Sequence, residues 1–276
     1  VDPNDLRKKI TRRTKAIIPV HLYGHMAYMD EILEMAKKKN IKIIEDASHA
    51  VGASYKKIKV GSCAYSDITV FSFHPVKIIT SAEGGMAVTN DDGIADQMER
   101  LRSHGITRDP EKMTHASDGP WYYQQVALGF NYRMTELQAA LGVSQMRRLD
   151  EFVARRHEIA RRYDDLLSAL PVVTPWQNPG DYSGLHLYVV RLKTEQLSRT
   201  HREVFESLRE RGIGVNLHYI PVHTQPYYLA MGFQPEDFPQ AQSYYRTAIS
   251  LPMYPGLTKD EQDEVISALA HAVEPS

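Results

Sequence analysis

Cysteine is almost absent from this sequence, and so are the features that would indicate a membrane or nucleic-acid-binding protein. The one cysteine, Cys63, excludes an internal disulfide framework and fits a reducing cytoplasm. No apolar run approaches the length of a membrane span, and no signal-peptide pattern opens the chain. The formal net charge of −1 gives no electrostatic reason to expect nucleic acid or an anionic membrane as a partner.

Several common functional motifs are missing too. Neither G-x-G-x-x-G after a strand nor G-x-x-x-x-G-K-[ST] occurs, so neither standard nucleotide-binding loop is supported. The serine-hydrolase motif G-x-S-x-G is also absent. His21 and His25 lie four residues apart in "HLYGH", but Gly24 interrupts them and no glutamate occupies the position that a zinc protease needs. We therefore interpret these histidines as polar residues of a loop after a strand, and we predict no metal site.

The 276 residues, 42% hydrophobic and 24% charged, are typical of a globular protein with one large domain, or with a large and a smaller one. The first half of the chain alternates strands with helices. This alternation predicts a largely parallel sheet covered by helices. We expect strands at 14–22, 41–46, 67–74 and 84–90, and helices at 29–40 and 91–104.

The second half predicts a bridging helix followed by a small α+β unit. The helical stretch 134–170 is dense in arginine and glutamate in its second part, and we expect it to break near Leu149 and Asp150. After it come a strand at 185–192, a helix at 200–212, an apolar segment at 213–219 and a final helix from about Thr258. We therefore predict a large domain at 1–150 and a small C-terminal domain at 151–276.

The stretch "SFHPVKIITSAEGG" (72–85) contains a lysine in an unusual setting. Pro75 cannot donate to a sheet ladder and ends the strand, so Lys77 lies just beyond a strand end. In a parallel α/β sheet, ligands bind at the carboxyl ends of the strands. The apolar neighbours of Lys77 would desolvate its ammonium and lower its pKa, which frees the amine for Schiff-base chemistry. The alternative is a lysine that only snorkels at a strand end.

A carboxylate and a hydroxyl accompany this lysine. The strand "IKIIED" ends on Asp46, which places the carboxylate at the carboxyl end of the adjacent strand. A Schiff-base lysine with a nearby carboxylate is the minimum set for pyridoxal phosphate, because the carboxylate keeps the pyridine nitrogen protonated. Ser72 offers a hydroxyl to the phosphate. The alternatives are a helix-cap or loop role for Asp46 and an ordinary strand position for Ser72.

Four long blocks follow one another at plausible spacing: "EDASHAVGASYKKIKVGS", "DITVFSFHPVKIITSAEGGMAVTN", "LRSHGI" and "LGFNYRMTELQAALGVSQMRRLD". Together they resemble the signature blocks of the DegT/DnrJ-type nucleotide-sugar aminotransferases, over essentially the whole chain. The resemblance implies the α/β aspartate-aminotransferase fold (pyridoxal phosphate fold type I), with a mainly parallel sheet and a smaller α+β domain. "SFHPVK", the histidine in "EDASHAVGA", and "GIGVNLHYIP" (212–221) are most similar to the branch that makes the 4-amino sugar precursor of pseudaminic acid.

The resemblance implies a role for each residue at the cofactor. Lys77 binds pyridoxal phosphate covalently and then shuttles the substrate proton. Asp46 pairs with the pyridine nitrogen, and Ser72 binds the phosphate. His49 lies beside the ring near its phenolic oxygen, at a position where most of the family has glutamine.

Three further residues are implied more remotely. Asn131 reaches the phosphate of the neighbouring subunit's cofactor, which implies a homodimer with shared active sites. Asn131 alone would equally fit a turn residue that caps the following helix. His218 and Tyr219 belong to a block near the sugar-nucleotide pocket.

The implied reaction transfers an amino group from glutamate to a nucleotide-linked 4-keto-6-deoxy sugar, most simply a UDP sugar, in glycan biosynthesis. Dehydrases of the same family replace the lysine with histidine, so Lys77 argues against that activity. The alternative from another class is a non-catalytic fragment that acts as a binding or dimerisation module.

Two departures from the family pattern qualify these expectations. Ser81 and Ala82 stand where many relatives have threonine and glycine. The family's phosphate-cradling "GTSAL"-like turn and the aromatic residue stacked on the ring have no counterpart in residues 1–276. We therefore expect the natural protein to begin before Val1, and residues 1–276 alone to be unstable or free of cofactor.

Overall fold

The computed structural model describes residues 1–274 and contains two compact units. Unit 1 comprises residues 1–149 together with Gly180–Gly184. Unit 2 comprises Asp150–Pro179 and the chain from Leu185 onward. Within residues 1–274 no helix has the length and apolar character needed to cross a bilayer. Each unit has its own hydrophobic core and is described separately.

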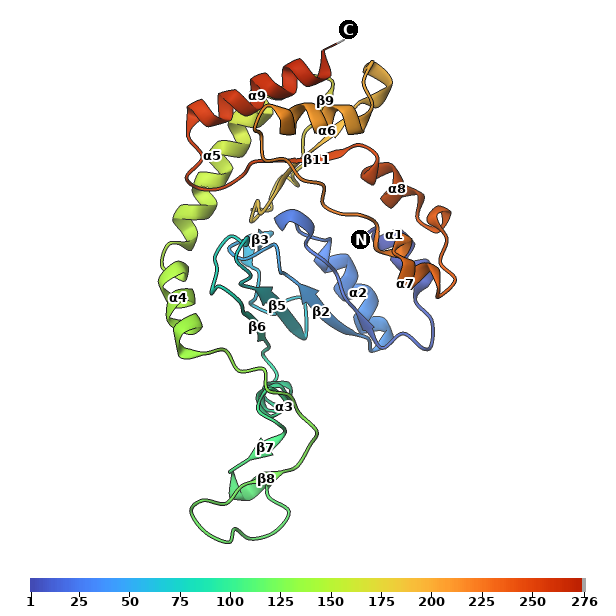
Figure 1. The fold of residues 1–276 in the computed structure, drawn as a ribbon. Helices are drawn as coiled ribbons and strands as arrows, with labels where there is room; N and C mark the ends of the chain where they lie inside the picture. The colour runs from blue at the N-terminus through green and yellow to red at the C-terminus, as the bar shows by residue number, and fades with distance from the viewer. Residues whose placement is uncertain (275–276) are drawn as a thin grey trace. The chain divides into compact units, whose positions relative to one another are not determined.

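Unit 1 is built on a four-stranded sheet in the order β1-β2-β5-β6 (Figure 1). The strands are β1 (Ala16–Ile17), β2 (Lys42–Asp46), β5 (Ile68–Ser72) and β6 (Gly85–Val88). The first three run parallel, and β6 pairs antiparallel with β5. Asp46 pairs in register with Val70, and Ser72 with Gly85. The sheet is therefore mainly parallel, as predicted, and β2 and β5 end side by side.

Helix α2 (Met29–Lys39) covers one face of this sheet. Its buried residues, which include Ile32 and Ala36, share a core with Ile43 of β2. Because side chains alternate along a strand, Glu45 lies on the same face as Ile43, and Asp46 lies on the opposite face. The helix thus leaves Asp46 on the face of β2 that it does not cover.

Proline explains why two of the predicted strands, 14–22 and 67–74, end earlier in the structure. The regular pairing of β1 stops at Ile17, and only Val20 adds an isolated bridge, to Asp46. Pro19, between them, has no N–H to donate. β5 ends at Ser72 instead of residue 74, just before Pro75.

The remaining elements of unit 1 extend away from the sheet or connect its strands. They are α1 (Pro3–Lys9), the 3₁₀ turn η1 (Leu22–Gly24), the hairpin β3 (Ser54–Tyr55) and β4 (Ile58–Lys59), α3 (Asp92–Arg102), β7 (Ile106–Thr107), the 3₁₀ turn η2 (Pro110–Lys112), β8 (Gln124–Gln125) and α4 (Glu136–Met146). The segment 105–128 contains a small sheet, in which β7 pairs antiparallel with β8. We call residues 92–135 the arm (Figure 1).

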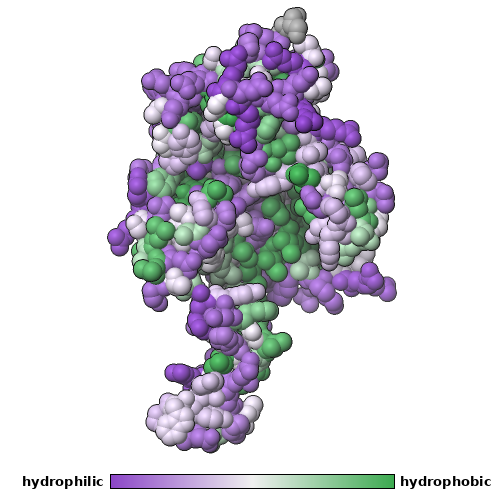
Figure 2. Space-filling model, viewed as in Figure 1, coloured by the Kyte–Doolittle hydropathy of each residue, from purple (hydrophilic) through white to green (hydrophobic). Residues whose placement is uncertain are grey.

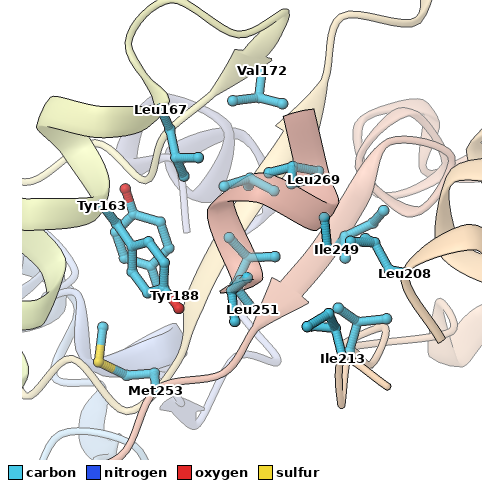
Figure 3. Packing of buried hydrophobic residues seen from close by; sticks show 14 of the residues in the cluster. Tyr163, Leu167, Val172, Tyr188, Leu208, Ile213, Ile249, Leu251, Met253 and Leu269 are labelled. Carbon is cyan, nitrogen blue, oxygen red and sulfur yellow. The ribbon is translucent and has the colours of Figure 1, made fainter. Parts of the chain in front are cut away.

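Unit 2 packs helices on a three-stranded antiparallel sheet in the order β11-β10-β9. Its elements are α5 (Leu149–Leu167), β9 (Val172–Val173), β10 (Tyr188–Leu192), η3 (Thr194–Gln196), α6 (His201–Glu210), η4 (Val222–Thr224), α7 (Pro226–Leu229), η5 (Pro235–Asp237), α8 (Pro239–Tyr245), β11 (Ala248–Leu251) and α9 (Lys259–Val273). Tyr163 and Leu167 of α5, Tyr188 of β10 and Leu269 of α9 meet in its core (Figure 3). The segment 213–219 forms no regular strand, and only Asn216 bridges to Ser250.

Candidate active site

Lys77 lies in a turn just after β5. Its backbone N–H donates to the carbonyl of His74 at 3.0 Å. Ile78 and Ile79 are buried, whereas Val76 is 66% exposed, so the apolar shielding comes from the residues that follow Lys77. Burial lowers the pKa of Lys77, while the charge of Asp46 acts in the opposite direction. The amine of Lys77 is therefore easier to deprotonate than that of an ordinary lysine, and it interacts electrostatically with the Asp46 carboxylate.

Asp46 is fixed at the end of β2 from several directions. Its N–H donates to the Pro19 carbonyl at 2.9 Å, and its carbonyl accepts the His21 N–H at 3.0 Å. Its Oδ1 accepts the Ser48 N–H at 3.0 Å. These hydrogen bonds fix both the backbone and the carboxylate of Asp46, on the face of the sheet that α2 does not cover. The structure brings Lys77 and Asp46 into one electrostatic neighbourhood.

His49 is buried just beyond Asp46. Its Nδ1 accepts the backbone N–H of Tyr23 at 3.2 Å, and the two rings stack with centroids 6.2 Å apart. Gly184 lies against the same place: a Cβ there would come within 3.1 Å of the His49 carbonyl and 3.0 Å of Ile78 Cδ1. Residues 180–184 thus border the site. The sequence did not predict this contact, because these residues lie more than a hundred positions after His49.

Ser72 and Asn131 have different surroundings. Ser72 ends β5 opposite Gly85, and its Oγ accepts the His74 N–H at 3.4 Å. Asn131 is exposed on the arm, where its backbone bridges to Ser103. Among residues 1–274, no hydrogen bond joins Asn131 to Lys77, Asp46 or Ser72. The structure thus groups Ser72 with the strand ends and leaves Asn131 on the arm.

His218 and Tyr219 belong to unit 2. His218 Nδ1 lies 2.7 Å from the Ser250 hydroxyl of β11. The rings of His218 and Tyr219 meet edge to face, with their centroids 4.8 Å apart. Burial raises the pKa of Tyr219. This pair is anchored to the sheet of unit 2 through Ser250.

A buried polar row crosses the covered face of the sheet and was not predicted. His21 is completely buried, and its Nε2 lies 2.8 Å from Glu45 Oε2. Glu45 also accepts hydrogen bonds from the hydroxyls of Ser66 and Thr69. Burial alone would raise the pKa of Glu45, but these hydrogen bonds outweigh it and lower the pKa. His21 does lie in the loop after β1, as interpreted from the sequence, but it is buried there and ties this loop to β2 beside Asp46.

Replacing His21 should destabilise the protein. In His21→Leu the Glu45 carboxylate stays buried without its imidazole partner, and we expect the free energy of unfolding to fall by about 3–5 kcal/mol at neutral pH. Because the folded protein holds the pKa of Glu45 below its ordinary 4.5, the row stabilises above that pH and loses its effect as the pH falls further. Urea unfolding at several pH values measures both effects.

The matched control is the double variant His21→Leu/Glu45→Gln, which removes the charge but keeps an acceptor for Ser66 and Thr69. We expect it to be more stable than His21→Leu at neutral pH, with the difference shrinking in acid. Equal stability of wild type and His21→Leu would show that the imidazole does not stabilise the carboxylate.

The arrangement defines a class of protein before any comparison. A half-buried lysine with a lowered pKa, a carboxylate on the neighbouring strand, a strand-end hydroxyl and a buried imidazole all gather at the carboxyl ends of parallel strands. This donor set fits pyridoxal phosphate, which needs an amine for its aldehyde, a carboxylate for its ring nitrogen and a hydroxyl for its phosphate.

Comparison with known proteins identifies the family. The sequence profile of the DegT/DnrJ/EryC1/StrS aminotransferase family matches residues 1–270. The spore coat polysaccharide biosynthesis protein SpsC of Bacillus subtilis is 39% identical over 276 residues, which cover 99% of this chain and 70% of SpsC. The chain belongs to the DegT/DnrJ/EryC1/StrS aminotransferase family, whose members depend on pyridoxal phosphate.

Solved structures agree with this assignment. PseC from Helicobacter pylori, an aminotransferase involved in the biosynthesis of pseudaminic acid, superimposes with a TM-score of 0.90 at 30% identity, covering 99% of this chain and 70% of PseC. The PLP form of the putative sugar aminotransferase Spr1654 from Streptococcus pneumoniae has a TM-score of 0.88 at 28% identity, covering 99% and 72% of the two chains. The predicted fold type I and pyridoxal phosphate dependence are confirmed, and the protein is a sugar aminotransferase.

Proposed function

We propose that the protein transfers an amino group from glutamate to a nucleotide-linked 4-keto-6-deoxy sugar, with UDP as the nucleotide, for surface glycan biosynthesis. The observation that carries the proposal is the pairing of Lys77, whose pKa is lowered by burial, with Asp46 on the neighbouring strand. The substrate class is supported by the similarity to PseC and SpsC, whose names refer to pseudaminic acid and to coat polysaccharide.

Each site residue has a distinct task in this proposal. Lys77 holds the cofactor covalently until the amino donor displaces it. Its neutral amine then accepts the proton from the α-carbon of the donor and returns it in the reverse half-reaction. Asp46 holds a proton on the ring nitrogen. When bound, pyridoxal phosphate supplies the carbonyl that carries the amino group and the ring that withdraws electrons.

Four other residues bind and orient the cofactor or the substrate. Ser72 donates its hydroxyl to the phosphate, and His49 contacts the ring beside the phenolic oxygen. His218 and Tyr219 of unit 2 contact the sugar nucleotide, where the hydrogen bond of His218 to Ser250 fixes the imidazole.

Two half-reactions test the proposal. Glutamate added to the purified protein loaded with pyridoxal phosphate should convert the cofactor to pyridoxamine phosphate and release stoichiometric 2-oxoglutarate. A UDP-linked 4-keto-6-deoxy hexose should then reverse the absorbance change and yield a 4-amino sugar, identified by NMR. A protein that reacts with glutamate but with no nucleotide-linked keto sugar would contradict the proposed acceptor.

The arm supports the further proposal that the protein is a homodimer with shared sites. Tyr132 beside Asn131 is 72% exposed and Leu128 is 88% exposed, and Leu137, at the start of α4 just after the arm, is 85% exposed. Figure 2 shows apolar side chains (green) among polar ones on the surface of the arm. Large apolar surfaces of this kind mark protein interfaces. A second copy that covers them would bring Asn131 to the phosphate in the neighbouring site.

Subunit mixing should show this sharing. We expect an equimolar mixture of Lys77→Ala and Asn131→Ala proteins, after exchange, to regain about a quarter of the wild-type rate at low cofactor concentration. Half of the dimers would be hybrids, and one of the two sites in each hybrid would carry both native residues. Demonstrated exchange without any recovery would refute cross-subunit sharing.

A further inference from the structure

The turn at residues 21–25 fixes the chemical state of His49. The backbone N–H of Tyr23 donates to His49 Nδ1 at 3.2 Å. Only a ring nitrogen that carries no hydrogen can accept this bond. The ring is therefore neutral and carries its hydrogen on Nε2, because a protonated imidazole has no acceptor nitrogen.

The turn holds Tyr23 in an unusual backbone conformation. Tyr23 has φ 61° and ψ 10°, the left-handed region that residues other than glycine seldom adopt. Such a residue persists only where its surroundings determine its conformation. Here the His21 N–H is bound to the Asp46 carbonyl, and the Gly24 carbonyl accepts the Gly184 N–H at 3.2 Å. The turn is thus tied to the strand end on one side and to residues 180–184 on the other.

A residue just after the turn sets the tautomer of a second imidazole in the same way. The Ala27 N–H donates to His21 Nδ1 at 3.2 Å, so His21 also carries its hydrogen on Nε2 and donates it to Glu45. Two amides within one short segment therefore fix the tautomers of two histidines.

We infer that the backbone N–H of Tyr23 holds His49 in its neutral Nε2–H form, so that His49 serves the cofactor site as a hydrogen-bond donor. Tyr23 is a positioning residue that acts through its backbone. The inference rests on the proposed function only for the acceptor, an anionic oxygen on the cofactor ring.

The tautomer can be read directly by NMR. In the cofactor-loaded protein labelled with ¹⁵N-histidine, at pH 8, we expect the His49 signals to be those of a pure Nε2–H ring, assigned by their loss in His49→Gln. Tyr23→Gly and Tyr23→Val both remove the stacked ring and keep the amide. Glycine adopts the left-handed conformation freely, whereas a β-branched residue resists it. We therefore expect the pure tautomer in Tyr23→Gly and a mixture of tautomers in Tyr23→Val.

Either of two results would overturn the inference: an Nδ1–H or protonated His49 in the wild type, or identical His49 spectra in Tyr23→Gly and Tyr23→Val. Rates then test the donor role separately. His49→Gln should react about 10- to 100-fold faster than His49→Asn, whose shorter amide reaches only the Nδ1 position. Equal rates with the tautomer intact would refute donation to the cofactor while leaving the role of the Tyr23 amide standing.

Discussion

Lys77→Arg is expected to abolish transamination while leaving the fold intact. Arginine keeps the positive charge but cannot form the covalent link to the cofactor or accept a proton from the substrate. We expect the rate to fall by roughly 10⁴-fold, the upper end of what general acid–base catalysis contributes. Borohydride reduction of the wild-type protein followed by peptide mapping should place the phosphopyridoxyl label on Lys77.

Lys42 provides a matched control for this prediction. Lys42 lies at the end of β2 opposite Asp46. Its hydrogen bond to Asp67 raises its pKa, whereas burial lowers the pKa of Lys77. In cofactor-free protein, Lys77 should therefore react with acetic anhydride at a lower pH than Lys42. Lys42→Arg should keep its activity. A phosphopyridoxyl label on another lysine, with none on Lys77, would exclude the assignment.

Much of the fold was predictable because local patterns and tertiary structure agree. The β-branched run of β5 and the apolar spacing of α2 produced elements close to those expected. The short β11 (Ala248–Leu251) escaped prediction although all four of its residues are buried, since a short apolar run carries no periodicity that separates strand from helix. The segment 213–219 shows the converse: its sequence is apolar, but only Asn216 forms a bridge, to Ser250.

The candidate site, too, was predictable only in part from the sequence. Lys77 and Asp46 were found because a proline and a pair of acids mark strand ends in the sequence, and the parallel sheet then sets those ends side by side. The contacts around them were not found. The hydrogen bond between His21 and Glu45 and the close approach of Gly184 to His49 join distant parts of the chain. No local sequence pattern predicts such contacts.

Asp46→Asn should separate the charge of this carboxylate from its structural role. Asparagine can still accept the Ser48 N–H, so we expect urea unfolding to stay near that of the wild type. The neutral amide cannot hold a proton on the ring nitrogen, which weakens the electron withdrawal that the reaction needs. We expect the rate of the glutamate half-reaction to fall by at least about a hundredfold, or roughly 3 kcal/mol.

A modified cofactor tests this explanation directly. Pyridoxal phosphate methylated on its ring nitrogen carries a permanent positive charge and needs no carboxylate to hold a proton there. We expect it to restore part of the lost rate in Asp46→Asn and to give no gain in the wild type. Because Lys77 remains in place in this variant, the recovery would depend on the ring charge alone. Near-normal rates in Asp46→Asn with the ordinary cofactor would instead show that the carboxylate serves only to fix the end of β2, through its bond to Ser48.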